Sequence, residues 1–184
     1  MKILVFTEGT VIMHKAAEGH TREERVEQSR LGGIQREEAS LAYNSKDDVP
    51  VEYGSVHDYS NYIPIGNAVK KLTGWSNQGA EIHYLTSRRV RKEIEAIKSL
   101  LQKHNFPDFE NLHFRQQGEN YKDVAERIIP DVLIEDDCES IGGGKEMVYP
   151  HIKPELKNKI KSVVVKEFGG IDDLPENLSE LICK

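Results

Sequence analysis

The chain has 184 residues, of which 38% are hydrophobic and 30% charged, which fits one globular domain with a sizeable core. Its net charge of −6 argues against a nucleic-acid partner, because binding a phosphate backbone requires concentrated positive charge. No apolar run approaches the roughly 18 residues of a membrane span, and no signal-peptide pattern is present, so we expect a cytoplasmic protein without a membrane partner.

Strands and helices are predicted to alternate along most of the chain. Short apolar segments predict strands at residues 2–6, 81–85, 111–114, 131–135 and 162–166. Helical spacing of apolar residues predicts helices at residues 68–75, 94–104, 124–129 and 154–160. This alternation, with short connections, indicates an α/β fold: a Rossmann-like three-layer parallel sheet with helices on both faces. Near-continuous apolar strands such as "DVLI" agree, because a strand covered on both faces loses its polar alternation.

Residues 11–64 interrupt the alternation. They are first crowded with charge and then rich in tyrosine ("EYGSVHDYSNYIP"), and they are too long for a crossover loop. We predict a small cap-like lobe here, inserted after the first strand, with one or two polar helices within residues 20–42. The core is then formed by residues 1–10 and 65–184. A partly disordered loop is the alternative that this composition leaves open.

Polar side chains follow three of the predicted strands at their carboxyl ends. Because the carboxyl ends of parallel strands open on one crevice, we expect these side chains to lie close together. Hydroxyls, a lysine and paired carboxylates suit a phosphate group held beside a divalent cation. The residues concerned are Thr7, Glu8, Gly9 and Thr10 after the first strand, Thr86 and Ser87 after the second, Asp136 and Asp137 after the fourth, and Lys122 ahead of the fourth.

Two neighbouring features are interpreted as structural. Arg88, Arg89 and Arg91 carry charge that could meet an anionic ligand, but we expect them to form the solvated start of the next helix. Cys138 follows the acidic pair, and the sequence offers it no base, so we do not expect it to act as a nucleophile.

The order and spacing of these motifs resemble the haloacid dehalogenase (HAD) superfamily, most of whose members are Mg²⁺-dependent phosphohydrolases. "NQGAEIHYLTSRR" resembles the second motif of that family, and "YKDVAERIIPDVLIEDD" resembles the third and fourth together. The resemblance implies that Thr86 and its neighbour Ser87 bind phosphate, that Lys122 stabilises charge, and that Asp136 and Asp137 hold Mg²⁺. It also implies a small phosphorylated or otherwise anionic ligand, and a cap in the place of residues 11–64.

The first motif departs from the family. Aligning "FTEGT" on Asp-x-Asp-x-Thr places Glu8 on the second aspartate, the general acid/base, and Phe6 on the first, the nucleophile and metal ligand. A phenylalanine cannot attack phosphorus, and it cannot bind a cation through oxygen. The usual aspartyl-phosphate reaction is therefore not expected of this chain.

Several interpretations stay open. In the first, the protein has lost catalysis and keeps the fold with a ligand site. In the second, Glu8, Asp136 and Asp137 hold a metal and water attacks the substrate directly. In the third, the chain is another doubly wound protein, such as a response-regulator-like or nucleotide-binding module, although no P-loop or Gly-x-Gly-x-x-Gly follows the first strand. The competing functional class is a non-catalytic interaction module that uses the tyrosine-rich insert.

Overall fold

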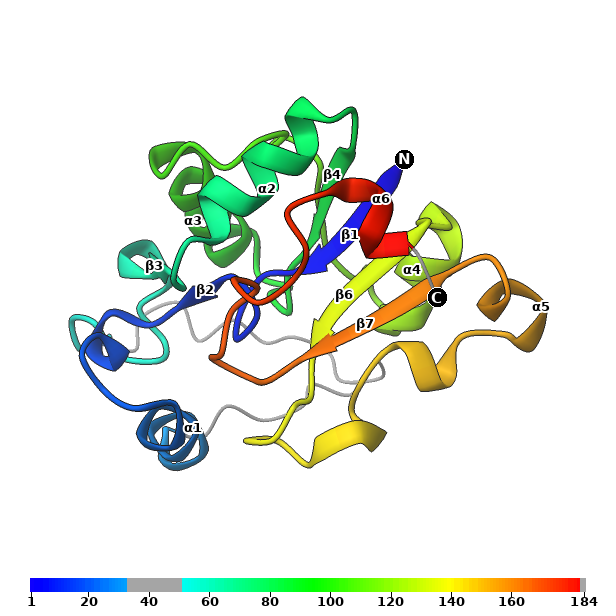
Figure 1. Cartoon of the computed structure of the whole chain (residues 1–184). Helices are drawn as coiled ribbons and strands as arrows, with labels where there is room; N and C mark the ends of the chain where they lie inside the picture. The colour runs from blue at the N-terminus through cyan, green and yellow to red at the C-terminus, as the bar shows by residue number, and fades with distance from the viewer. Residues whose placement is uncertain (33–50, 183–184) are drawn as a thin grey trace.

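A five-stranded parallel sheet is the centre of the fold in residues 1–32 and 51–182, which are the residues that the computed structural model describes (Figure 1). Its strand order is β5-β4-β1-β6-β7. The strands are β1 (Lys2–Phe6), β4 (Glu81–Leu85), β5 (Leu112–His113), β6 (Val132–Asp136) and β7 (Lys161–Val165). A separate antiparallel ladder joins β2 (Ile12–Met13) to β3 (Ile63–Pro64). The predicted α/β fold with a parallel sheet is confirmed.

Helices follow most of the strands, as predicted. The α-helices of the described residues are α1 (Arg22–Leu31), α2 (Ala68–Asn77), α3 (Arg91–Lys103), α4 (Tyr121–Ile128), α5 (Pro154–Lys157) and α6 (Leu178–Ile182). Short 3₁₀ turns lie at η1 (Lys15–Ala17), η2 (Tyr59–Asn61), η3 (Gly143–Lys145) and η4 (Tyr149–His151). The helix predicted at residues 154–160 is shorter than expected: it ends at Lys157, and Ile160 is a buried core residue just before β7 begins.

The central strand β1 sends alternate side chains into two separate cores. Ile3 and Val5 pack in a cluster that includes residues of α2 and α3, whereas Leu4 packs in a cluster that includes residues of α4. All three side chains are fully buried. Both faces of β1 are therefore covered, which explains why its sequence is apolar without interruption.

The inserted segment returns to the core beside the point where it leaves. Ile12 is paired with Pro64 and Met13 with Ile63, so β2 and β3 lie side by side where the inserted segment begins and ends. Helix α1 agrees with the polar helix predicted here, and a capping box between Thr21 and Glu24 fixes its start. The predicted lobe also includes residues 33–50, which lie outside the described residues, so its extent stays a prediction.

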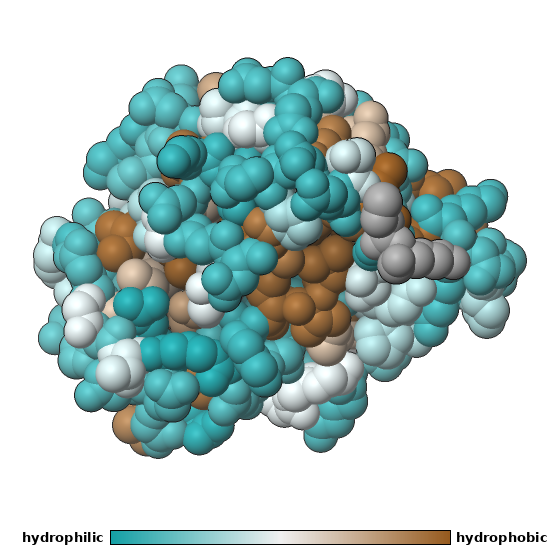
Figure 2. All heavy atoms as spheres, in the orientation of Figure 1, coloured by the Kyte–Doolittle hydropathy of each residue, from teal (hydrophilic) through white to brown (hydrophobic). Residues whose placement is uncertain are grey.

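The edge strand β7 leaves part of the hydrophobic surface uncovered. Figure 2 shows a hydrophobic area near the centre of the face seen in Figure 1, where β7 and α6 lie. On these two elements, Val164 and Ile182 are each about half exposed, at 49% and 47%.

Among the described residues, no helix combines the length and the apolar character needed to cross a membrane.

Candidate functional site

A pocket opens at the carboxyl edge of the sheet, where β1, β4, β6 and β7 end. Its cavity volume is about 100 Å³, which is room for several water molecules or a small ligand group. The walls combine aromatic rings with carboxylates and one guanidinium. The lining residues are Phe6, Glu8, Gly9, Ser29, Tyr62, Ser87, Arg88, Tyr121, Glu135, Asp136, Cys138, Ile141, Glu146, Val148, Glu167 and Phe168. The predicted convergence of strand ends on one crevice thus brings together residues from β1, β4 and β6.

Glu8 lies among hydrogen-bond donors from two strand ends. The Thr86 hydroxyl donates to Glu8 Oε1 at 2.5 Å, and the Ser87 backbone N–H donates to Oε2 at 3.1 Å. The Thr7 hydroxyl, from the neighbouring position on the chain, donates to Oε2 at 2.6 Å. The structure therefore brings Glu8, Thr86 and Ser87 together, as the sequence predicts. It gives the two predicted phosphate-binding groups a carboxylate as their partner.

Arg88 contributes the positive charge of the pocket, contrary to the expected solvated helix start. Its side chain is 11% exposed, and its Nε lies 3.7 Å from Glu8 Oε1. The guanidinium donates to the Tyr59 hydroxyl at 2.5 Å and to Ser87 Oγ at 2.7 Å. The solvated interpretation fits Arg91, whose side chain is 92% exposed, and fails for Arg88 because Tyr59 and Glu8 enclose it.

Asp136 is buried at the end of β6. Its Oδ2 accepts a hydrogen bond from the Thr10 hydroxyl at 2.9 Å, and its Oδ1 accepts one from the Cys138 N–H at 2.9 Å. Gly9 packs so closely that a Cβ there would lie 3.0 Å from Asp136 Oδ2, and its φ of +80° also favours glycine. The "EGT" turn therefore needs its glycine to bring Thr10 onto Asp136.

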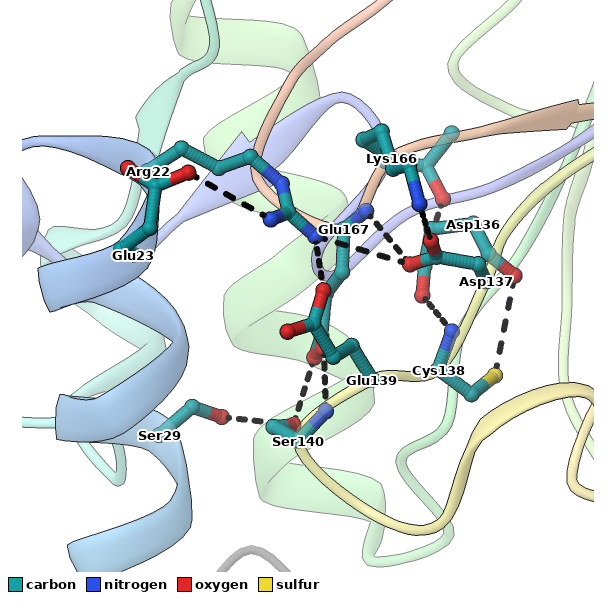
Figure 3. A network of polar contacts seen from close by, with 11 residues as sticks. Arg22, Glu23, Ser29, Asp136, Asp137, Cys138, Glu139, Ser140, Lys166 and Glu167 are labelled. Carbon is teal, nitrogen blue, oxygen red and sulfur yellow. Dashed lines mark hydrogen bonds and ion pairs between the residues drawn. The ribbon is translucent and has the colours of Figure 1, made fainter.

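Burial and a second carboxylate change the acidity of Asp136. Burial first, and then the charge of Glu167, raise the pKa of Asp136 from its ordinary 3.8 to about 7. Burial likewise raises the pKa of Glu167, which accepts hydrogen bonds from the Ser140 N–H and hydroxyl, both at 2.6 Å (Figure 3). Glu167 lies just beyond β7 and was missed by the sequence reasoning, because no charge pattern or motif around "KEFGG" marks it.

Three predicted site residues do not line the pocket: Thr86, which is fully buried and hydrogen-bonded to Glu8, and Asp137 and Lys122. Asp137 accepts hydrogen bonds from Lys166 Nζ at 2.9 Å and from the Glu167 N–H at 3.0 Å, and Arg22 of α1 lies 3.8 Å from it (Figure 3). Lys122 lines a neighbouring groove at the start of α4. Side-chain direction after a strand depends on such local partners, which strand spacing alone does not specify.

The groups at the pocket differ from the Mg²⁺ site that the resemblance implies. At the end of β1, Phe6 lines the pocket with its ring, which packs edge-on against Tyr121 with centroids 5.3 Å apart. Of the two predicted metal ligands, Asp136 lies in the pocket and Asp137 is held outside it by Lys166. Among residues 1–32 and 51–182, no group of three or more His, Cys, Asp or Glu side chains is arranged to hold a metal ion. As arranged here, these side chains do not form that site.

The chemistry available to the pocket follows from these groups. Phe6 offers no nucleophile, and burial raises the pKa of the Cys138 thiol, so Cys138 is protonated and unreactive at neutral pH. The Thr86 hydroxyl, the Ser87 N–H and the Arg88 guanidinium are groups of the kind that hold an anion, and here they surround the Glu8 carboxylate.

Comparisons with known proteins support the fold. No protein-family model and no curated protein sequence match the chain. A solved structure, the class C acid phosphatase from Bacillus anthracis with tungstate bound, is similar with a TM-score of 0.52 and 12% identity, covering 92% of this chain and 68% of that one. At this identity the similarity shows a shared α/β fold and nothing finer.

Proposed function

We propose that this chain is a HAD-like protein that binds a small phosphorylated or otherwise anionic ligand at the carboxyl edge of its sheet and does not carry out the aspartyl-phosphate reaction. The observation that carries the proposal is the Phe6 ring, which lines the pocket where the alignment expects the nucleophilic carboxylate. The fold shared with an acid phosphatase and the presence of Thr86 and Ser87 beside Glu8 support the ligand class.

The ligand would bind at the hydroxyls, the N–H group and the guanidinium that now surround Glu8. Such donors hold phosphoryl oxygens without taking part in bond cleavage. Mg²⁺ stays an expectation from the resemblance, with Asp136 as its one predicted ligand in the pocket. No step of the proposed function passes through a metal ion.

Phosphatase assays test the loss of catalysis. With p-nitrophenyl phosphate and Mg²⁺, we expect the wild-type protein to release no more phosphate than a protein-free control. The Phe6→Asp variant is expected to gain slow, Mg²⁺-dependent turnover, at least about tenfold above the matched Phe6→Asn variant, because only the aspartate supplies a carboxylate nucleophile.

Two results would contradict this expectation. Hydrolysis by the wild-type protein would support the interpretation in which water attacks directly. Equal inactivity of Phe6→Asp and Phe6→Asn, with both variants folded, would show that position 6 is not the nucleophile position and that the alignment of the first motif is wrong.

A second candidate function is the interaction module. Three large hydrophobic side chains of the inserted segment are more than half exposed: Leu31 at 78%, Val51 at 52% and Tyr53 at 73%. Protein contact surfaces often include exposed apolar side chains, so these three are the candidates for a contact made by the inserted segment. Two observations together would favour this function. The melting temperature would not change when phosphate or vanadate is added, and the protein would self-associate or bind a partner through these side chains.

A further inference from the structure

The carboxylate of Glu8 occupies a set of donors that has the composition of an anion-binding site. Its two oxygens accept hydrogen bonds from the hydroxyls of Thr7 and Thr86, at 2.6 and 2.5 Å, and from the Ser87 N–H at 3.1 Å. The guanidinium of Arg88 lies 3.7 Å away. We call these four groups, on Thr7, Thr86, Ser87 and Arg88, the anion cradle.

Carboxylate and phosphate oxygens use the same kinds of partner. Both accept hydrogen bonds from hydroxyls and backbone N–H groups, and both pair with guanidinium. The cradle is also sheltered: Thr7 and Thr86 are fully buried, and the side chain of Glu8 is only 14% exposed. A phosphate oxygen and the Glu8 carboxylate therefore cannot use the Thr86 hydroxyl and the Ser87 N–H at the same time.

We infer that Glu8 is a built-in competitor for the ligand, an autoinhibitory side chain that fills the anion cradle and that any anionic ligand must displace. This inference rests on the proposed function, because it concerns the same site. When a binding-competent state is a small fraction of the population, the apparent affinity falls by that fraction. The wild-type protein should accordingly bind anions more weakly than its donor set alone would allow.

The length of the side chain at position 8 matters as well as its charge. Glu8 reaches across from the end of β1 to the residues that follow β4, and the register pairs Phe6 with Leu85 at the end of this ladder. An aspartate has one methylene group less, so its carboxylate would stop short of the Thr86 hydroxyl and the Ser87 N–H. Glu8→Asp therefore tests occupancy of the cradle while it leaves the net charge of the pocket unchanged.

Isothermal titration with inorganic phosphate, repeated with tungstate as a second probe, measures the competition. The proteins compared are wild type, Glu8→Ala, Glu8→Asp and Glu167→Gln, in a metal-free buffer. We expect both Glu8 variants to bind phosphate at least about tenfold more tightly than wild type. Glu167→Gln removes one carboxylate from the same pocket and leaves Glu8 in its cradle, so its affinity should stay within about threefold of wild type.

Each other outcome overturns a specific statement. If wild type binds phosphate and neither Glu8 variant binds it more tightly, Glu8 is not a competitor, and the proposed function stands without this inference. If the phosphate affinity of Glu167→Gln rises as much as that of Glu8→Ala, then the net charge of the pocket controls binding and not the occupancy of the anion cradle by Glu8. The inference is again wrong in that case. If no protein binds either anion, the inference and the proposed ligand class both fail. Should Glu8→Ala not fold, Glu8→Asp alone decides, because it keeps the charge next to Arg88.

Discussion

Asp136→Asn is expected to raise the free energy of unfolding by about 2–4 kcal/mol at pH 8 relative to wild type, and to give no such gain at pH 4. The pKa of Asp136 is raised from 3.8 to about 7, so between these values the folded protein holds a proton that the unfolded chain has released. Wild-type stability therefore falls as the pH rises through this window, by roughly 4 kcal/mol in total, and stays low above it.

Asparagine removes the free-energy cost of burying a charged carboxylate at position 136, because its side chain is neutral at every pH. Its carbonyl oxygen can still accept from the Cys138 N–H, and its amide can donate to the Thr10 hydroxyl. Urea unfolding at pH 4, 6 and 8 measures the difference between the two proteins.

The neighbouring substitution Asp137→Asn is a matched control, for which we expect the opposite effect on the free energy of unfolding at pH 8. Although burial acts to raise the pKa of Asp137, hydrogen bonds from Lys166 and from the Glu167 N–H lower it. Its charged form therefore stabilises the fold, and asparagine should be slightly less stable than wild type at pH 8. An Asp136→Asn protein with the same dependence of stability on pH as wild type would show that Asp136 is ionised in the folded state already at low pH.

Trp75→Ala is expected to lower the free energy of unfolding by about 3–5 kcal/mol, the largest loss predicted for this chain. Trp75 lies on α2 with none of its side chain exposed, and its indole N–H donates to the Pro175 carbonyl at 3.0 Å. Truncation leaves a cavity between α2 and the sheet and removes the hydrogen bond to the C-terminal segment. Chemical denaturation followed by circular dichroism measures the loss.

Trp75→Phe separates the two contributions. It keeps most of the buried ring and loses the hydrogen bond, so we expect it to cost about 1–2 kcal/mol. Asn77→Ala, at an exposed position two residues along the same helix, should change stability by less than about 0.5 kcal/mol. A loss below about 1 kcal/mol for Trp75→Ala would mean that α2 is not packed on the sheet as described.

The sheet was predictable because its signals are local. β1 and β4 coincide with the predicted strands at residues 2–6 and 81–85, and β6 and β7 differ from prediction by one residue at each end. Each of these five-residue strands contains at least three apolar residues, a local pattern that a short stretch of sequence is enough to show. β5 is only two residues long and pairs with β4 at the sheet edge.

The site was predictable only in part, because its arrangement depends on contacts between distant segments. The residues that follow β1, β4 and β6 could be placed at one edge from topology, and Glu8, Thr86 and Asp136 are indeed found there. That Lys166 and the Glu167 N–H hold Asp137 outside the pocket follows from the position of β7. Arg88 was misjudged for the same reason, since its burial depends on Tyr59 in the inserted segment.

The position of β1 in the middle of the sheet has a consequence for how the chain folds during synthesis. Ile3 is paired with Ile82 on one side and with Val132 on the other, so β1 leaves the ribosome long before either neighbour exists. Pairing across such sequence separations is slow, and unpaired apolar strands are prone to aggregation until it occurs. The nascent protein must therefore keep an apolar strand without partners until β4 has been made, and its sheet can be completed only after β6 and β7 emerge.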